Sequence, residues 1–336
     1  MLAATTIPGA GADPPYVPPA WLPGRHLQTI YPALLPRPDL PYRRERWDTP
    51  DGDFIDLDWI EGERGAPLVA LYHGLEGGSR SHYALALMSA VHARSWHGVV
   101  VHFRGCSGEP NRLPRAYHSG DTEEAGWTLK RLKAMFPDVA VYAVGVSLGG
   151  NLLLKWLGEK ADAARDLVTR AAAVSAPMDL MAAGDALEEG FNRFYTRHFL
   201  ESLKPKIFLK LARHPDLIDR HRITRAATMR EFDDAFTAPV HGFRDTDDYW
   251  TRASSKPWLS RIEVPTLVLN ARNDPFLPER ALPDGSAVSP SVTLEFPSQG
   301  GHAGFCTGPF PGRLTWLPQR LLAFFSSDVR PDPWDN

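Results

Sequence analysis

The chain has 336 residues, 43% of them hydrophobic, which suits one large α/β domain or two smaller ones and excludes disorder as the dominant state. Its formal net charge is −3, and acidic and basic residues are mixed along it, so nothing favours a nucleic-acid partner. Its two cysteines, Cys106 and Cys306, are too few for a disulfide framework and lie outside metal-ligand spacings. We therefore expect no metal, no cofactor and a reduced, cytoplasmic setting.

Residues 1–41, the first segment of the chain, are rich in proline. Residues 1–13 lack the basic and apolar regions of a secretory signal, and no apolar run approaches the roughly 18 residues of a membrane-spanning helix. Peripheral contact with a membrane stays open. Because proline removes amide donors and forbids regular helix or central strand, we expect an extended arm that lies on the domain.

Residues 42–176 have the pattern of a sheet with covering helices. Residues 42–49 and 54–60 flank an Asp51-Gly52 turn, and the period-two alternation of the second run predicts a half-exposed antiparallel hairpin. Apolar strands and amphipathic helices then alternate, which predicts a mostly parallel central sheet covered by helices on both faces. The expected strands are 68–72, 98–103, 139–144 and 171–174, and the expected helices are 83–94 and 121–136.

The most informative motif is Gly145-Val146-Ser147-Leu148-Gly149, which follows an apolar strand and opens a helix-forming segment. This is the sequence form of a nucleophile elbow, in which a serine on a strained turn needs neighbours without side chains. The N-terminus of the next helix offers unpaired N–H groups to a developing oxyanion. The motif predicts a serine hydrolase with Ser147 as its nucleophile, against the alternative of an ordinary glycine-rich turn.

The alternation of strand and helix stops at Ala176-Pro177. Residues 177–256 are largely helical and aromatic in pattern, which predicts a helical cap inserted over the carboxyl end of the sheet, although packing for stability explains most of its aromatic residues. Residues 257–336 return to strand and helix and form the expected second part of the core. Its elements are strands at 266–270 and 292–296 and a closing helix at 314–325.

A serine nucleophile needs a base and a carboxylate that orients the base. In hydrolases with such an elbow, the acid and then the histidine follow the serine, each in a loop after a strand. Asp274 is the only carboxylate of the loop at 271–276, and His302 lies in a glycine-flanked loop after the last strand. We expect them to be the acid and the base, against the alternatives of a turn aspartate before Pro275 and a structural histidine.

The oxyanion hole needs two N–H donors. One is expected from Leu148, directly after the nucleophile, and the other from the glycine-rich loop His73-Gly74-Leu75-Glu76-Gly77-Gly78. Leu75 is the expected second donor and Gly74 the alternative, while the His73 side chain is expected to hold the loop. Cys106 and Cys306 are expected near the site, but without a base of their own they are poor nucleophile candidates.

Motifs along nearly the whole chain resemble those of the bacterial YheT-like α/β-hydrolases. They are His26-Leu27-Gln28-Thr29, His73-Gly74-Leu75-Glu76-Gly77, residues 102–112, Tyr117-His118-Ser119-Gly120, residues 145–151, Arg230-Glu231-Phe232-Asp233-Asp234, Asp274-Pro275-Phe276 and residues 300–305. The resemblance implies an α/β-hydrolase fold with a helical cap and a triad of Ser147, Asp274 and His302. Relatives often carry two consecutive aspartates in the acid loop, whereas Asn273 precedes Asp274 here, which removes an ambiguity about the acid.

Eukaryotic relatives include membrane-anchored phospholipases and yeast enzymes that make or cleave medium-chain fatty acid ethyl esters, so the resemblance implies ester chemistry on an acyl chain. We therefore expect a serine carboxylesterase that hydrolyses small short- to medium-chain acyl esters or lipids through an acyl-enzyme. An acyltransferase, a thioesterase or a phospholipase would use the same triad. A ligand-binding module of the same fold is the alternative from a different class.

Overall fold

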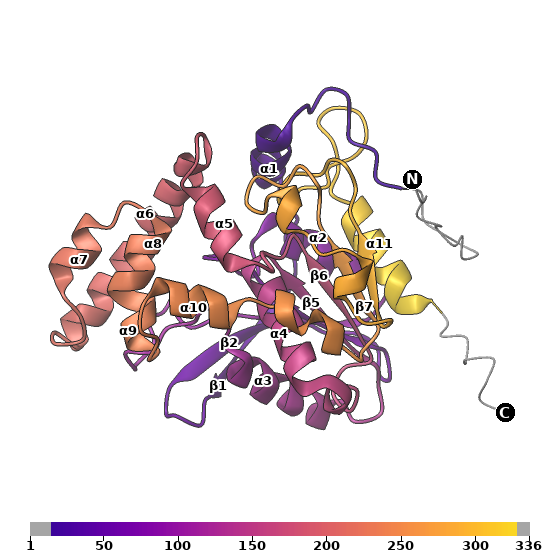
Figure 1. The fold of residues 1–336 in the computed structure, drawn as a ribbon. Coiled ribbons are helices and arrows are strands. Elements are labelled where there is room, and N and C mark those ends of the chain that lie inside the picture. Colours follow the sequence, from indigo (N-terminus) through magenta and orange to yellow (C-terminus); the bar gives the residue numbers. More distant parts are fainter. Residues whose placement is uncertain (1–14, 328–336) are drawn as a thin grey trace.

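The computed structural model describes residues 15–327, so the ends of the predicted arm and of the second core segment, including residues 1–13, lie outside the described residues. An eight-stranded sheet in the order β1-β2-β4-β3-β5-β6-β7-β8 forms the centre of the molecule (Figure 1). Strand β2 pairs antiparallel with β1 and β4, and the other neighbours are parallel. The strands are β1 (Arg43–Asp48), β2 (Phe54–Ile60), β3 (Leu68–Tyr72), β4 (His97–Val101), β5 (Val141–Val146), β6 (Arg170–Val174), β7 (Thr266–Leu269) and β8 (Val292–Glu295).

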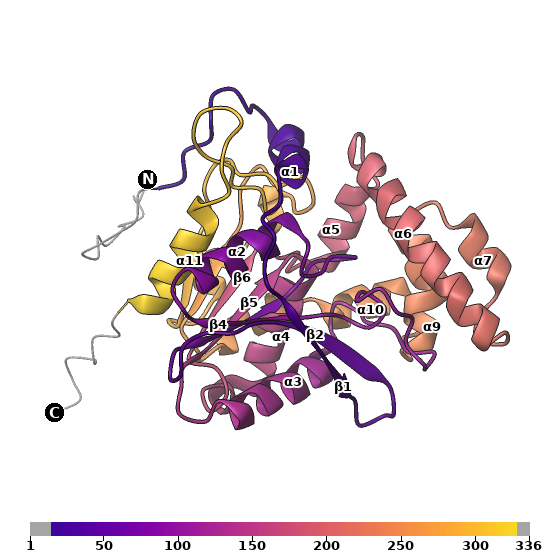
Figure 2. The same ribbon diagram turned by 180° about the vertical axis from the view of Figure 1, so that it is seen from behind.

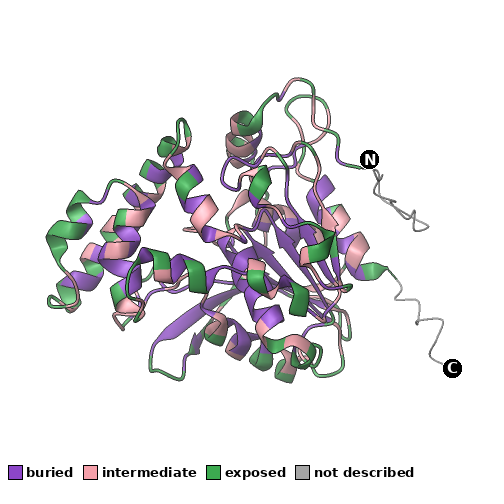
Figure 3. Ribbon diagram, in the orientation of Figure 1, coloured by how far each residue is buried: buried purple, intermediate pink, exposed green. Residues whose placement is uncertain are grey.

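Helices cover both faces of this sheet (Figure 2). Alternate residues of one strand enter opposite apolar clusters: Leu68 and Ala70 pack with α3 (Thr122–Met135) and α4 (Leu148–Lys160), whereas Val69 packs with α2 (His82–His92) and α11 (Trp316–Ser326). The central strands β3, β5, β6 and β7 are therefore buried along their whole length, as the purple colour at the centre of the sheet in Figure 3 shows, which is why they read as continuous apolar runs. The predicted fold class is confirmed.

The hairpin of β1 and β2 is antiparallel as predicted, but the expected exposed face of β2 was wrong, because every residue of β2 is buried. Basic side chains cover the polar side of the strand: Arg46 donates two hydrogen bonds to Asp56, and Asp58 accepts from Arg44 and His102 at 2.8 Å each. Although burial by itself would raise the pKa of Asp58, the hydrogen bonds from His102 and Arg44 lower it below its ordinary value.

The expectation of an arm without regular helix was also wrong, because α1 (Arg25–Leu34) forms inside it. The residues from Arg25 to the residue before Pro32 contain no proline, and Gly24, at a φ of 79°, directs the chain into the helix. Pro32 lies in the last turn, where a missing amide costs only one intrahelical hydrogen bond. The described part of the arm lies beside the loops before α11 (Figure 1).

The residues after β6 form a separate group of helices at one side of the sheet, with an apolar cluster of their own (Figure 1). The helices are α5 (Leu180–Leu187), α6 (Asn192–Arg213), α7 (Arg220–Arg225), α8 (Met229–Phe232), the π-helix η2 (Asp233–Thr237), α9 (Ala238–Val240) and α10 (Thr246–Ala253). Short 3₁₀ helices elsewhere are η1 (Ala161–Ala164), η3 (Lys256–Arg261), η4 (Glu279–Ala281) and η5 (Gly285–Ala287). The division into arm, core and cap, with the cap at residues 177–256, stays a prediction. Along residues 15–327, no helix combines the length and hydropathy needed to cross a bilayer.

Candidate active site

Ser147 stands on the sharp turn between β5 and α4. Its φ of 53° and ψ of −121° are strained for a residue with a side chain. The turn requires its glycines, because a Cβ on Gly149 would lie 2.3 Å from the carbonyl oxygen of Tyr72, and one on Gly145 would lie 2.3 Å from that of Gly149. The local sequence therefore builds the strained elbow geometry that it predicts.

The side chains of Asp274 and His302 contact each other. The Nδ1 of His302 lies 2.9 Å from Oδ2 and 3.1 Å from Oδ1 of Asp274, a buried carboxylate in the loop after β7. Because a carboxylate only accepts, Nδ1 is the donor in this contact. The Phe276 ring packs on the imidazole with centroids 4.2 Å apart. The contact thus uses Nδ1 of His302 and leaves Nε2 for another partner.

Ser147 and His302 line the same cavity, although within residues 15–327 no hydrogen bond is made by the Ser147 hydroxyl. Catalytic hydrogen bonds are often long in a free enzyme and tighten when substrate binds. Of the three predicted residues, the structure thus joins the acid to the base and places the base in one cavity with the serine.

Leu75 and Leu148 line the cavity beside Ser147. In the loop after β3, the amide of Gly74 donates to the Tyr83 hydroxyl at 2.8 Å, and the amide of Glu76 donates to the Tyr117 hydroxyl at 3.0 Å. The amide between them, that of Leu75, has no hydrogen-bond partner in the described part of the chain. This pattern favours Leu75 over Gly74 as an available donor.

Other polar groups near the site serve the structure. The Nε2 of His73 accepts from the amide of Phe103 at 3.1 Å, its Nδ1 donates to the carbonyl of Gly74, and burial lowers the pKa of His73 to about 3. This neutral histidine holds the loop, as expected. Burial raises the pKa of the Cys106 thiol to about 12 and also raises that of Cys306, so neither supplies a thiolate nucleophile.

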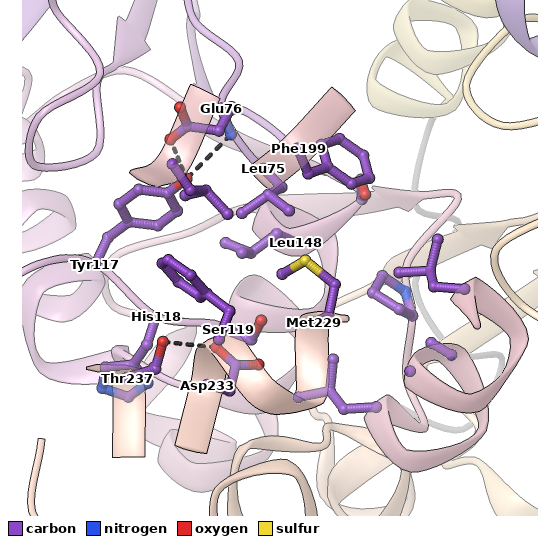
Figure 4. Close-up of a pocket in the computed structure, with 18 of the residues that line it drawn as sticks. Leu75, Glu76, Tyr117, His118, Ser119, Leu148, Phe199, Met229, Asp233 and Thr237 are labelled. Carbon is purple, nitrogen blue, oxygen red and sulfur yellow. Dashed lines mark hydrogen bonds between the residues drawn. The ribbon is translucent and has the colours of Figure 1, made fainter. Parts of the chain in front are cut away.

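The cavity is mostly apolar and has a polar group at each end (Figure 4). Met229 and Leu148 lie in its middle, and at one end Glu76 accepts a hydrogen bond from Tyr117 and forms an ion pair of 2.7 Å with Lys206. The opposite end carries Asp233. A mostly apolar space that Ser147 lines is suited to an acyl chain.

Asp233 is 7% exposed and lies on the π-helix η2. Its carboxylate accepts from the Thr237 hydroxyl at 2.6 Å and from the Trp250 indole at 2.8 Å. Because burial penalises the charged form, the pKa of Asp233 is raised to about 6. At the end opposite Glu76, the cavity thus carries a carboxyl group whose charged form is disfavoured by burial.

Several residues that contact the site were given no part in it by sequence reasoning. Tyr83 and Lys206 belong to regular helical patterns, and nothing in their surroundings along the chain marks their contacts with the loop after β3. Gln28, Thr29 and Asp233 had a signal, because they belong to motifs of the resemblance. The motifs indicated that these residues matter, but they did not indicate which residues they contact.

Known proteins resemble this chain in sequence. The sequence profile described as alpha/beta hydrolase fold matches residues 67–309. The chain is 42% identical to the Escherichia coli protein named "Putative esterase YheT" over 88% of each chain. It is 32% identical to the mouse protein named "Phospholipase ABHD3", over 94% of this chain and 79% of the relative.

Solved structures support the fold. Est1E from Butyrivibrio proteoclasticus superposes with a TM-score of 0.55 at 14% identity, over 84% of this chain and 97% of Est1E. So low an identity supports the fold alone. Together with the profile and the YheT match, it shows that the chain belongs to the alpha/beta hydrolase fold family, among the YheT-like hydrolases.

Proposed function

We propose that the chain is a serine carboxylesterase that hydrolyses short- to medium-chain acyl esters. Ser147 attacks the ester carbonyl while His302 takes its proton, and Asp274 orients the imidazole and stabilises its charged form. The amides of Leu75 and Leu148 bind the tetrahedral oxyanion. His302 then returns the proton to the leaving alcohol, and water attacks the acyl-enzyme to release the acid and the free serine.

The observation that carries this proposal is the 2.9 Å contact between His302 and Asp274 beside a cavity that Ser147 lines. A binding module has no need of a cavity histidine that a buried carboxylate orients. The apolar lining supports an acyl substrate, and relatives named as an esterase and a phospholipase support an ester or lipid. Acyl transfer, thioester cleavage and phospholipid cleavage use the same chemistry, and product analysis with added ethanol separates transfer from hydrolysis.

The test is Ser147→Ala, assayed with p-nitrophenyl esters of increasing chain length. We expect kcat to fall at least about 1,000-fold, because the nucleophile is lost while the oxyanion donors stay. Ser286→Ala, at an exposed serine of η5, is the matched control and should keep full activity. Full turnover by Ser147→Ala, or a wild-type protein that a fluorophosphonate probe does not label, would contradict the proposal.

A further inference from the structure

Helix α1 carries the motif His26-Leu27-Gln28-Thr29, to which the proposed reaction gives no role. Gln28 lies 245 residues before Asn273 in the sequence, and Thr29 lies 273 residues before His302, yet both side chains contact the two loops that hold the acid and the base. The contacts are direct hydrogen bonds. Helix α1, near the start of the chain, thus contacts the loops of Asp274 and His302, which lie near its end.

The side-chain amide of Gln28 is buried, with 1% exposure, and its four hydrogen-bonding positions are all used. Its Oε1 accepts from the amide of Gly300 at 3.0 Å and from Nδ2 of Asn273 at 2.9 Å. Its Nε2 donates to the carbonyl of Leu22 at 3.0 Å and to Oε1 of Gln299 at 2.8 Å. Because a backbone amide can only donate and a backbone carbonyl only accepts, Gly300 and Leu22 leave one orientation of the amide group.

These bonds join the acid loop to the histidine loop. Asn273, the residue before Asp274, donates to Gln28 and accepts from the amide of Gly301 at 3.0 Å. Gly301 in turn precedes His302. The side chains of Gln28 and Asn273 therefore connect the residue before the acid to the two residues before the base.

Thr29 acts on His302 itself. Its hydroxyl accepts from the backbone amide of His302 at 2.9 Å and donates to the carbonyl of Arg25 at 2.7 Å. The second bond orients the hydroxyl, so its lone pair faces the His302 amide. The backbone from which the imidazole extends is thus held by a side chain of α1.

The packing of α1 against the histidine loop leaves no room for side chains. A Cβ on Gly301, whose φ is 63°, would lie 2.7 Å from the carbonyl carbon of Gln28, and a Cβ on Gly304 would lie 2.0 Å from its oxygen. In a regular helix the carbonyl oxygen of Gln28 would accept from the amide of residue 32. Because Pro32 has no amide hydrogen, that oxygen is open to the approach of Gly304. A shift of α1 would therefore move the loop that carries His302.

We infer that Gln28 and Thr29 are positioning residues that set the place of the His302 imidazole relative to Ser147 and Asp274. The inference rests on the proposed triad. Within residues 15–327 the Ser147 hydroxyl makes no hydrogen bond that could draw the imidazole toward it. The place of Nε2 therefore depends on the loop backbone that Thr29 holds and on the contact of Nδ1 with Asp274. A misplacement of about 1 Å in such a site costs on the order of 100-fold in rate.

The experiment is Thr29→Val, which removes the hydroxyl and keeps the shape of the side chain. We expect kcat for a p-nitrophenyl ester to fall about 10- to 100-fold while KM stays within about twofold, because the cavity is unchanged and only the base is displaced. Thr29→Ser restores the hydroxyl and should recover kcat. Asn273→Ala, at a half-buried side chain, should show the same split between kcat and KM.

The matched control is Thr224→Val. Thr224 is an exposed residue of α7 whose hydroxyl also donates to the carbonyl four residues earlier, that of Arg220, at 2.9 Å. It should keep wild-type kcat. A kcat within twofold of wild type for both Thr29→Val and Asn273→Ala, or a loss in Thr29→Val that serine does not recover, overturns the inference. Failure of the proposed function is a separate result, because it would appear as a wild-type protein without esterase activity or as a Ser147→Ala variant that stays active.

Discussion

Replacing the buried carboxyl at the end of the cavity should stabilise the protein at neutral pH. In Asp233→Asn, the carboxamide oxygen accepts from the Trp250 indole, and its NH₂ group donates to the Thr237 hydroxyl, which rotates to accept. The variant keeps the shape and both partners. What it removes is a charge that burial disfavours.

The magnitude follows from the pKa of Asp233, which is raised from 3.8 to about 6 in the folded protein. Between pH 3.8 and about 6, Asp233 binds more protons in the folded protein than in the unfolded chain. The free energy of unfolding therefore falls as pH rises through this window, and the loss remains at higher pH. At roughly 1.4 kcal/mol per pKa unit, the ionised carboxylate costs about 3 kcal/mol at pH 7 and above, and nothing well below pH 3.8.

Urea denaturation of the variant and the wild type at pH 5 and pH 8 measures this difference. Subtracting the two proteins at each pH cancels the other titrating groups. We expect Asp233→Asn to be more stable at pH 8, and its advantage to be about 1.4 kcal/mol larger there than at pH 5. Asp216→Asn, at an exposed aspartate, should show no such change. An advantage that is the same at both pH values, or a variant less stable at pH 8, would refute the reasoning.

Two further predictions concern the elbow and the cavity. Gly149→Ala places a Cβ 2.3 Å from the Tyr72 carbonyl oxygen and should lower the free energy of unfolding by at least about 3 kcal/mol in urea titrations. Gly285→Ala, with no atom within 4 Å of its Cβ, should leave the free energy of unfolding nearly unchanged. A loss of stability as large as that of Gly149→Ala would contradict this account. Met229→Trp fills part of the cavity and should lower kcat/KM for octanoyl esters at least about tenfold while sparing acetyl esters; an unchanged chain-length profile would oppose an acyl-binding role.

Local sequence was enough for the features that depend on neighbouring residues. The elbow at Ser147 was predictable because a strained turn needs Gly145 and Gly149 beside it, and the strands were predictable because burial on both faces leaves continuous apolar runs. Asp274 and His302 were found by their places after strands, and the structure brings their side chains into contact. Their catalytic roles stay a proposal.

The tertiary structure alone decided the features that depend on contacts between distant residues. Alternation along β2 predicted an exposed face, but basic side chains from outside the strand cover it. The density of prolines concealed the helix that carries Gln28. Only the fold shows that Tyr83 occupies the amide of Gly74 and leaves that of Leu75 free within the described chain. The reason is physical: periodicity records which side of an element is apolar, whereas a hydrogen-bond partner hundreds of residues away leaves no periodic signal.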